Sequence, residues 1–492
     1  MIRPLHTLLF LLGVMVSLAF LGWVFPKDGI AIGEAFTLKL PAPGSVLFPK
    51  KEATVDISTI EAMTTEAPEE STAADSVVTD SSMVNLEVDT TQLASIADRI
   101  QLHYPNGDRS VLYPLFAALE QAHAHGSPVR VMHYGDSQLE GDRITSYLRN
   151  KLQTRFGGSG PGLVSVADIV PHFSVDRELT GDWTRYSVMA RKDPTQRHTR
   201  FGALSSFSRF TPILPDTVKP DSTVHRATFT LRPSANAYAK AKTWSECRLF
   251  FGWHRAPVRI SVTVDGVLVD SEVEWPEDRL ITRTWRFSTP PKSVTFDLEG
   301  ADSPDIYGVS LEGRSGVCMD NIAARGGAGY EFSKVDQGLS RRMYQELDVS
   351  LLILQYGGNV LPNIHSKEEA DQYGKAFGAQ IARFRKLIPG VTVMVIGPSD
   401  MSIKEGDAMI TRPFLEDVRD ALKTNTLAQG GVFWDMYTAM GGRNSMVSWV
   451  EADPPLAATD YIHFSPYGAR KVGELFHTAF IADYLEYVKH KE

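Results

Sequence analysis

Short, largely apolar segments alternate with amphipathic segments of helical spacing through much of the chain, and this alternation limits the fold more than any other feature. Such apolar runs are typical of strands buried on both faces of a parallel sheet. The expected strands are Val129–Tyr134, Val349–Gln355, Val391–Ile396 and Val432–Met436. The expected helices between and after them are Gln138–Phe156, Lys367–Leu387, Phe414–Leu427 and Tyr467–Val488. We therefore predict an α/β fold with a doubly wound parallel sheet and a site at the strands' carboxyl ends.

The alternation is interrupted once, between about residues 170 and 313. Helical spacing disappears there, and Asp265-Gly266 between two alternating runs is a strong hairpin signal. The alternating runs are Ala227–Leu231, Arg248–Gly252, Val258–Val264, Val267–Val273, Thr282–Phe287 and Ser293–Leu298. We predict an antiparallel β-sandwich over residues 170–313, inserted into an α/β domain formed by 92–169 and 314–492. Its five tryptophans fit a core, with sugar stacking as the alternative.

The N-terminus carries a separate signal. Arg3 precedes an uncharged apolar run, Leu8–Phe25, which is close to the roughly 20 residues needed to cross a bilayer. No clean Ala-x-Ala signal-peptide cleavage site follows this run. Over residues 1–26 we therefore favour an uncleaved signal anchor over a cleaved signal peptide. Residues 27–91 are poor in aromatics, and the stretch from Glu61 to Asp89 is rich in Ser, Thr, Ala and acidic residues. This composition predicts a flexible acidic tether holding an exported domain.

Charge and cysteine content exclude several classes of protein. The net charge of −9 on 492 residues gives no support for nucleic-acid binding. Two cysteines, Cys247 and Cys318, are too few for a disulfide scaffold and match no zinc pattern. Whether these two residues pair with each other stays open at this point.

The turn Gly135-Asp136-Ser137 follows the first expected strand and precedes a helix. A residue in this place is exposed at the carboxyl edge of the sheet, with its backbone N–H pointing out of a helix start. Ser137 therefore has the geometry of a nucleophile with one oxyanion donor built in. An ordinary turn whose Asp or Ser caps the helix is the alternative.

Partners for such a serine lie at other expected strand ends. Asp460 and His463 precede the last helix at a spacing that lets the carboxylate hold the imidazole, although both also fit a loop and cap. Asn359 ends Gly357-Gly358-Asn359 after the strand Val349–Gln355 and offers a side-chain amide. The run Gly326-Gly327-Ala328-Gly329 follows the predicted insert and offers an unobstructed backbone N–H. Ordinary turns are the alternative for both glycine-rich segments.

Ser after the first strand, Gly in the second loop, Asn in the third and Asp-x-x-His before the last helix resemble the four blocks of the SGNH (GDSL-like) hydrolases. The resemblance covers roughly residues 127–169 and 314–488 and implies a flavodoxin-like α/β fold. It implies Ser137 as nucleophile, His463 as base and Asp460 as its orienting carboxylate. It also implies an oxyanion hole from Ser137, Gly326 and Asn359, with Gly327 in reserve, and no cofactor or metal.

A narrower resemblance rests on three further features. These are Gly-Asp-Ser-Gln in place of Gly-Asp-Ser-Leu, Gly158–Gly162, and Asp320–Ala328 after a β insert. Together they are similar to the bacterial peptidoglycan O-acetylesterases, whose insert is similar to a carbohydrate-binding module. Two departures stand out: Arg325 replaces the usual Asn before the glycine, and Val360 replaces a polar residue after Asn359.

This resemblance implies a serine esterase that removes O-acetyl groups from a cell-envelope glycan, with peptidoglycan as the first expectation. The implied place is the periplasm, with the N-terminal segment holding the protein at the inner membrane. Two alternatives stay open: a glycan O-acetyltransferase with the same Ser-His-Asp machinery, and a non-catalytic glycan-binding protein. The oligomeric state stays open as well.

Overall fold

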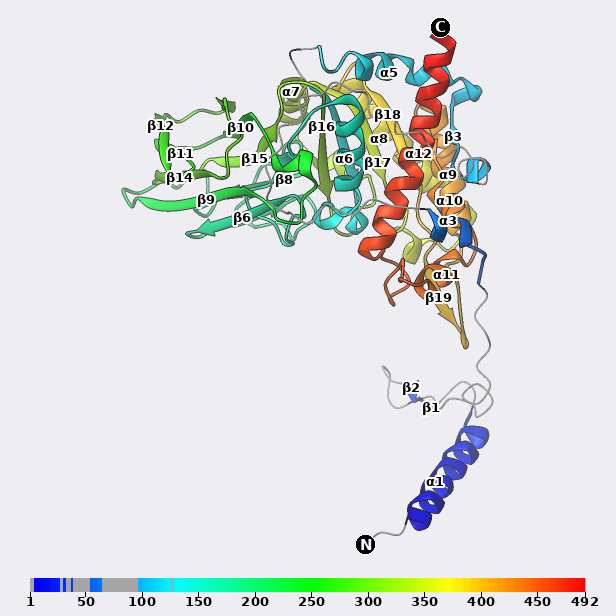
Figure 1. Ribbon diagram of the computed structural model, residues 1–492. Coiled ribbons are helices and arrows are strands. Elements are labelled where there is room, and N and C mark those ends of the chain that lie inside the picture. The colour runs from blue at the N-terminus through cyan, green and yellow to red at the C-terminus, as the bar shows by residue number, and fades with distance from the viewer. Residues whose placement is uncertain are drawn as a thin grey trace.

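The computed structural model describes residues 4–26, 30–31, 37–38, 54–63, 96–124, 126 and 128–491. A six-stranded sheet covered by helices lies beside two antiparallel sheets, and a separate N-terminal helix lies away from both (Figure 1). The predicted fold class, a doubly wound α/β sheet with an inserted antiparallel β-sandwich, is confirmed.

The central sheet has the order β16-β4-β17-β18-β21-β3, and all neighbours in it are parallel except β21 and β3. Its strands are β3 (Leu102–His103), β4 (Val129–Gly135), β16 (Val317–Ala323), β17 (Val349–Gln355), β18 (Thr392–Ile396) and β21 (Val432–Trp434). The five parallel strands, taken in chain order, give the flavodoxin-like order 2-1-3-4-5. The order reverses direction between β4 and β17, and ligands of such folds bind at the carboxyl ends of the strands there.

Helices cover both faces of this sheet. The longer helices are α5 (Tyr113–Glu120), α6 (Thr145–Phe156), α7 (Gln337–Leu347), α8 (Lys367–Leu387), α9 (Leu415–Ala428) and α12 (Pro466–Lys491). Residues of α5, α6 and α12 share one apolar core with Val131, whereas residues of α7, α8 and α9 share the other core with Met132. Adjacent residues of β4 thus enter opposite cores, which explains why its apolar residues are not confined to alternate positions. The two polar residues of the strand, Arg130 and His133, are buried and hydrogen-bonded to Asp320 and Gln355.

The shorter elements lie outside the central sheet and its longer helices. They are α3 (Ser58–Ala62), α10 (Met436–Met440), α11 (Ser445–Glu451), β1 (Ile30–Ala31), β2 (Thr37–Leu38), β19 (Ser402–Glu405), β20 (Ala408–Thr411), and the 3-10 helices η1 (Pro105–Gly107), η2 (Arg109–Leu112), η3 (Ser137–Asp142), η4 (Ala239–Lys242), η5 (Glu331–Lys334) and η6 (Leu361–Asn363).

The inserted region forms two antiparallel sheets that enclose an apolar core. One sheet has the order β13-β10-β15-β8-β7 with β5 paired to β15, and the other has the order β12-β11-β14-β9-β6. The strands are β5 (Gly162–Val164), β6 (Val175–Thr180), β7 (Thr184–Ser187), β8 (Ser206–Arg209), β9 (His225–Pro233), β10 (Glu246–Gly252), β11 (Val258–Val264), β12 (Val267–Glu274), β13 (Leu280–Arg286), β14 (Val294–Gly300) and β15 (Asp305–Glu312). Because β5 joins this sheet, the sandwich begins before residue 170.

The sheet that contains β10 and β15 is covered on both sides. Leu249 and Phe251 face the sandwich core, while Phe250 lies in the same apolar cluster as Met343 of α7. The buried guanidinium of Arg130 on β4 also forms ion pairs with Asp320 of β16 and Glu312 of β15. The sandwich is therefore joined to the α/β domain by a continuous core, not by a hinge alone.

Two predicted elements differ from the structure. The expected helix Gln138–Phe156 is broken, because Glu140 is extended and Gly141 has a φ of 68°, which ends η3 before α6 begins. The expected strand Val432–Met436 ends at Trp434, and Met436 already begins α10. Strand β16 was not predicted as a strand, since its seven residues include the polar pair Asp320-Asn321.

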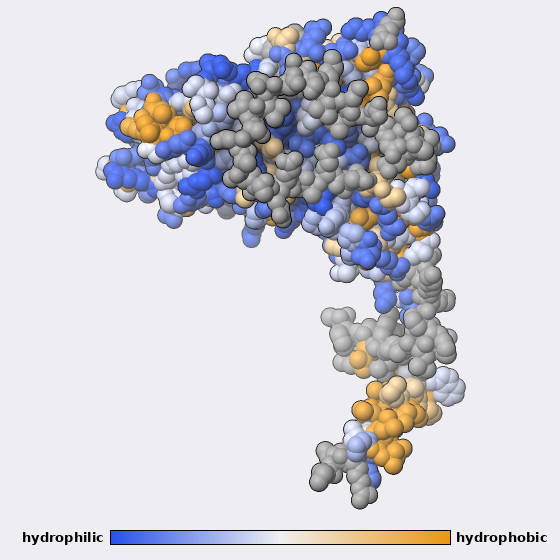
Figure 2. Space-filling model, in the orientation of Figure 1, coloured by the Kyte–Doolittle hydropathy of each residue, from blue (hydrophilic) through white to orange (hydrophobic). Residues whose placement is uncertain are grey.

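Helix α1 (Pro4–Val24) is the one helix within the described residues that is long and apolar enough to cross a membrane. Its side chains are nearly all exposed and hydrophobic (Figure 2). Length and composition alone support this, and a signal sequence passes the same test. The prediction of a signal anchor or signal peptide over residues 1–26 is compatible with α1.

Most of the predicted tether, residues 27–91, lies outside the described residues. Within it, however, residues 54–63 pack against the folded domain, with Ile57, Ile60 and Met63 buried in the core that includes α12. The Ser448 hydroxyl accepts from the Val55 amide at 2.7 Å and donates to the Val55 carbonyl at 2.9 Å. The expectation of a flexible segment is wrong for these ten residues, because their apolar side chains have a surface to bury against.

Candidate active site

The turn after β4 places Ser137 at the carboxyl edge of the central sheet. Asp136 caps η3, since its Oδ1 accepts from the backbone N–H of Gln138 at 2.9 Å. Gly135 has no room for a side chain: a Cβ would lie 2.7 Å from a Leu139 methyl and 3.0 Å from the Gln355 carbonyl oxygen. The strand can therefore turn sharply next to β17, and Ser137 is left half-buried at the edge.

Ser137, His463 and Asp460 form one chain of hydrogen bonds. Ser137 Oγ lies 2.9 Å from His463 Nε2, and His463 Nδ1 lies 2.7 Å from Asp460 Oδ2. The carboxylate selects the tautomer that carries a proton on Nδ1, so Nε2 accepts from the serine hydroxyl. The structure thus brings Ser137 to the pair Asp460 and His463, although Ser137 and His463 lie 326 positions apart in the sequence.

The loop before α12 preorganises the histidine. Asp460 Oδ1 accepts from the backbone N–H groups of Ile462 at 2.9 Å and His463 at 3.0 Å, while Tyr461 adopts a left-handed φ of 58°. Partial burial raises the pKa of Asp460, but hydrogen bonds from the His463 ring and from the two backbone amides outweigh burial and leave the pKa below its usual value. Asp460 is therefore ionised at neutral pH and holds the ring.

Gln138 fixes the same loop from the other side, a role that sequence reasoning missed. Its Nε2 donates to the Ile462 carbonyl at 2.7 Å, and its Oε1 accepts from the Phe464 N–H at 3.3 Å. The Gln138 side-chain amide is thus hydrogen-bonded to the backbone on both sides of His463. The departure from Gly-Asp-Ser-Leu was the only signal in the sequence, because an apolar Leu could make neither bond.

Asn359 lies beyond the end of β17 and faces the nucleophile turn. Its Nδ2 donates to Asp136 Oδ2 at 3.1 Å and to the Gly327 carbonyl at 3.0 Å. Burial raises the pKa of Asp136 to about 6. Through its two carboxyl oxygens, Asp136 holds both the start of η3 and the Asn359 amide. Because both amide hydrogens already have acceptors, donation to a substrate requires one of them to be shared or exchanged.

The glycine loop after β16 contains two candidate oxyanion donors, the backbone N–H groups of Gly326 and Gly327, and their surroundings differ. The Gly327 N–H already donates to the Ala324 carbonyl at 2.8 Å. Gly326 has a φ of 76°, open space around its Cα, and an amide for which the described residues provide no acceptor. The loop is held in place by Tyr373, whose hydroxyl donates to the Ala328 carbonyl at 2.8 Å. This geometry favours Gly326 over Gly327 as a donor.

A cleft of about 180 Å³ opens beside these groups, and we call it the Ser137 cleft. It is lined by Ser137, Asn359 and His463 and, from the segment between β18 and α9, by Pro398, Met401 and Arg412. The Arg412 Nε is buried without a hydrogen-bond partner among the described residues. Sequence reasoning gave no role to the segment from 397 to 412, since its lining residues form no motif.

No group of three or more His, Cys, Asp or Glu side chains within the described residues could hold a metal ion. Cys247 and Cys318 are both buried and are not bonded to each other. Cys247 lies in the sandwich core, and Cys318 lies in β16 of the central sheet.

No protein-family model and no curated protein matches the sequence. The sheet order and the four blocks at the strand ends define the fold of the SGNH hydrolases, in agreement with the sequence-based resemblance. More specifically, the chain is similar to a solved peptidoglycan O-acetylesterase, with a TM-score of 0.58 and 19% identity over 78% of this chain and 99% of that chain. Because residues outside 170–313 make up less than 78% of the chain, the likeness includes part of the sandwich.

A second solved structure shares less of the fold. It is a family two carbohydrate esterase from Clostridium thermocellum in complex with cellohexaose, with a TM-score of 0.25 and 9% identity over 62% of this chain and 99% of that chain. At 19% identity, the likeness to the peptidoglycan O-acetylesterase establishes the fold alone.

Proposed function

We propose that this protein is a serine esterase that removes O-acetyl groups from a cell-envelope glycan. The observation that carries the proposal is the hydrogen-bond chain from Ser137 through His463 to Asp460, which ends at the Ser137 cleft. A serine is a weak nucleophile until a neighbouring base takes its proton, and this chain supplies both the base and the group that orients it.

The reaction has two steps. His463 Nε2 takes the Ser137 proton while Oγ forms a bond to the acetyl carbonyl carbon, and the C–O bond to the sugar then breaks as His463 protonates the leaving sugar oxygen. Water next attacks the acetyl-serine, with His463 as base again, and releases acetate and free Ser137. Atoms balance without any cofactor: one ester and one water give one alcohol and one carboxylic acid.

Three donors are available for the oxyanion of each tetrahedral intermediate. The Ser137 backbone N–H points out of the start of η3, and the Gly326 N–H lies on the neighbouring loop. The Asn359 amide supplies the third donor after it releases or shares one of its present acceptors. In such sites a single donor is typically worth on the order of a hundred- to a thousandfold in kcat.

Solvent access supports hydrolysis over acetyl transfer. The His463 side chain is 35% exposed and the Asp460 side chain is 47% exposed, so water reaches the base directly. A transferase with the same residues would need to keep water away from its acyl-enzyme. A non-catalytic binding role is less favoured, because all three members of the hydrogen-bond chain are present and aligned.

Peptidoglycan bearing O-acetylated muramic acid is the substrate we propose. The similar solved structure is that of a peptidoglycan O-acetylesterase, and the apolar α1 helix is compatible with export and tethering to the inner membrane. Both observations support a periplasmic enzyme. The glycan and the membrane are thus the two proposed partners, and no nucleic acid is expected.

The test is acetate release by the full-length protein from O-acetylated peptidoglycan and from acetylated xylan, beside Ser137→Ala. Release from peptidoglycan that is lost in the variant is the expected result. Unchanged turnover of p-nitrophenyl acetate by Ser137→Ala would contradict the nucleophile assignment. Transfer of the acetyl group to an added glycan, with no acetate released from either polymer, would identify a transferase instead.

A further inference from the structure

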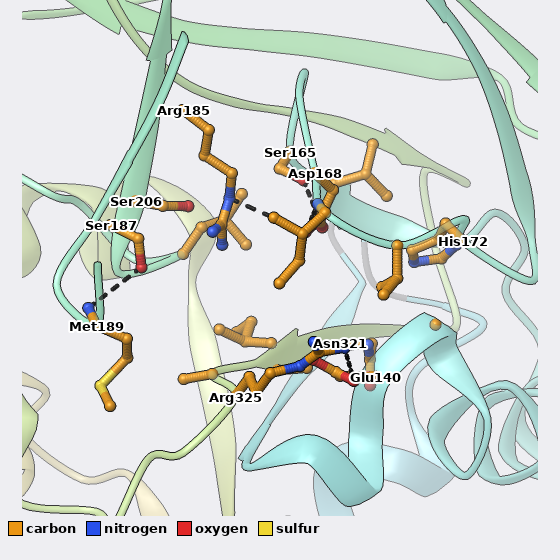
Figure 3. A pocket seen from close by; sticks show the side chains of 18 of the residues that line it. Glu140, Ser165, Asp168, His172, Arg185, Ser187, Met189, Ser206, Asn321 and Arg325 are labelled. Carbon is orange, nitrogen blue, oxygen red and sulfur yellow. Dashed lines mark hydrogen bonds and ion pairs between the residues drawn. The ribbon is translucent and has the colours of Figure 1, made fainter. Parts of the chain in front are cut away.

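A second cleft, of about 250 Å³, lies between the α/β domain and the sandwich, and we call it the junction cleft. One wall comes from η3, from the end of β16 and from the loop that follows it, including Glu140, Asn321 and Arg325. The other wall comes from the sandwich and the loop that leads into it, including Asp168 and Arg185. Figure 3 shows Arg185 and Arg325 extending toward the cavity from these opposite walls.

The junction cleft carries surplus positive charge. Its lining contains three guanidiniums, those of Arg177, Arg185 and Arg325, against the carboxylates of Asp168 and Glu140. Burial lowers the pKa of the remaining titratable group, His172, to about 4, so this imidazole is neutral at pH 7. One net positive charge is therefore left in the cavity.

The surplus charge lies on Arg185, because closer arginines already occupy the two carboxylates. Arg325 holds Glu140 with two hydrogen bonds of 2.6 and 2.8 Å, and Arg177 lies 3.5 Å from Asp168. Arg185 approaches Asp168 only to 4.0 Å, and its buried Nε has no hydrogen-bond partner among the described residues. The Arg185 side chain is 19% exposed and lines the cavity, so this guanidinium, which has no close counter-ion, is suited to an incoming anion.

The rim of the same cavity is apolar. Ile169 is 63% exposed and Met189 is 37% exposed, and both line the junction cleft. An apolar rim beside a cationic floor fits a sugar ring that packs its C–H face and carries a carboxylate. The guanidinium prefers a carboxylate for geometric reasons as well, since its parallel N–H groups match the two oxygens.

The two clefts are neighbours along the chain. Ser137 lines the first cleft, and Glu140, three residues later in η3, lines the second. Three residues span at most roughly 11 Å of extended backbone. Likewise Arg325, which lines the junction cleft, immediately precedes the oxyanion candidate Gly326. A polymer seated with an ester at Ser137 is therefore within reach of the junction cleft.

We propose that the junction cleft is a binding subsite for a sugar that bears a free carboxylate, such as a muramic acid whose lactyl group carries no stem peptide. This sugar lies on the same glycan chain whose ester is cleaved at Ser137, and Arg185 binds its carboxylate. The proposal deepens the proposed function and rests on it for the identity of the polymer. It assigns the sandwich wall a share in choosing the substrate, in addition to any glycan binding on its outer surfaces.

The test uses a matched pair of ligands and full-length Ser137→Ala in detergent, so that no turnover interferes. The disaccharide of N-acetylglucosamine and N-acetylmuramic acid carries a lactyl carboxylate, whereas chitobiose lacks it. Calorimetric titration should give at least tenfold tighter binding of the acidic disaccharide. Arg185→Gln should abolish this difference, Arg185→Lys should keep part of it, and Arg226→Gln, at an arginine 76% exposed on β9, should change nothing.

A second variant tests the junction cleft independently, in case Arg185→Gln does not fold. Ala190→Trp adds bulk at the exposed rim of the junction cleft without altering any charge, and it should weaken binding of the acidic disaccharide at least tenfold. Equal binding of the two disaccharides, binding of neither, or discrimination that survives both substitutions would overturn the proposal.

Esterase activity is a separate readout. With Ser137 intact, Arg185→Gln should leave turnover of p-nitrophenyl acetate unchanged. It should raise the KM about tenfold for O-acetylated glycan strands freed of their stem peptides, in which the lactyl carboxylate is no longer an amide. Loss of the proposed function alone would appear as Arg185-dependent binding by a protein that releases no acetate. Failure of the subsite alone would appear as normal acetate release with no preference for the acidic disaccharide.

Discussion

The Ser137 cleft and the junction cleft flank the same 3-10 turn, yet they are built in different ways. The Ser137 cleft collects the ends of parallel strands β4, β17 and β18 and the loop before α12. The junction cleft takes only one wall from that sheet edge and takes the other from the sandwich. Reactive groups are thus gathered where a doubly wound sheet always brings its strand ends together, while a second binding surface arises where two domains meet.

The two clefts also differ in how their polar groups are satisfied. In the Ser137 cleft, Ser137, His463 and Asp460 hold one another at hydrogen-bond distance before any substrate arrives. In the junction cleft, Arg185 still lacks a hydrogen-bonding acceptor for its Nε among the described residues. A preorganised set suits chemistry, whereas an unsatisfied cation suits recognition.

Removal of the whole sandwich cannot separate these two roles. Phe207, Phe250 and Tyr307 of the sandwich lie in one apolar cluster with Met343 and Tyr344 of α7. Deletion of residues 170–313 would expose that cluster and destabilise the α/β domain itself. Single substitutions in each cleft are therefore the way to compare them.

The largest effect is expected for Ser137→Ala. Loss of the nucleophile should lower kcat for p-nitrophenyl acetate by about four to six orders of magnitude, because no other group in the Ser137 cleft replaces it. Binding of the acidic disaccharide in the junction cleft should be unchanged. A variant that lost both activity and binding would show that the two clefts are one site.

Asn359→Ala should lower kcat by about a hundred- to a thousandfold with little change in KM, since an oxyanion donor acts in the transition state. Steady-state kinetics on p-nitrophenyl acetate measure this. The exposed Asn363, in η6 four residues further on, provides the control substitution Asn363→Ala. Equal kinetics for both variants would exclude the Asn359 amide from the oxyanion hole.

Gln138→Leu should lower kcat by roughly ten- to a hundredfold, because the His463 loop loses both hydrogen bonds and the base moves from its place. KM for p-nitrophenyl acetate should stay the same, and so should the melting temperature. Gln345→Leu on the exposed face of α7 is the control. A change in KM without a change in kcat would argue against a positioning role.

The smallest effect concerns stability and pH. Since burial raises the pKa of Asp136 to about 6 from 3.8, the folded state binds this proton more tightly than the unfolded state. The stability that this proton contributes is complete below pH 3.8 and is lost as pH rises through 6. Wild type should lose on the order of 1 kcal/mol of unfolding free energy relative to Asp136→Asn between pH 5 and 7. Urea unfolding at both pH values checks this, and parallel curves would mean that Asp136 stays ionised in the fold.

Local sequence patterns were sufficient for three elements of the α/β domain, β4, β17 and α8. Val349–Gln355 and Lys367–Leu387 have the predicted bounds as β17 and α8, and β4 extends the predicted strand by one residue to Gly135. These elements are long, strongly apolar or strongly periodic, so a short window of residues defines them. The candidate residues follow because they come directly after such strands.

Strand β16 and the packed residues 54–63 were harder to predict for opposite reasons. The polar pair Asp320-Asn321 breaks the apolar pattern of β16, but Arg130 and Thr145 satisfy those side chains in the fold. Residues 54–63 are bordered by low-complexity sequence, yet their apolar side chains are buried in the core that includes α12. In both cases a distant partner outweighs the local signal.

The sequence by itself determined the inserted sandwich and the candidate site residues that follow the expected strands, in their order along the chain. These candidates are Ser137, Asn359, Asp460 and His463. Both results depend on turn chemistry and apolar periodicity, which act over a few residues. Only the tertiary structure decided that Gln138 grips the loop around His463 across 324 positions, and that Gly327 is already hydrogen-bonded while Gly326 is open. Only the tertiary structure formed the junction cleft around Arg185. Such contacts depend on how elements far apart in the sequence pack against one another, and a pattern within a few residues does not encode that packing.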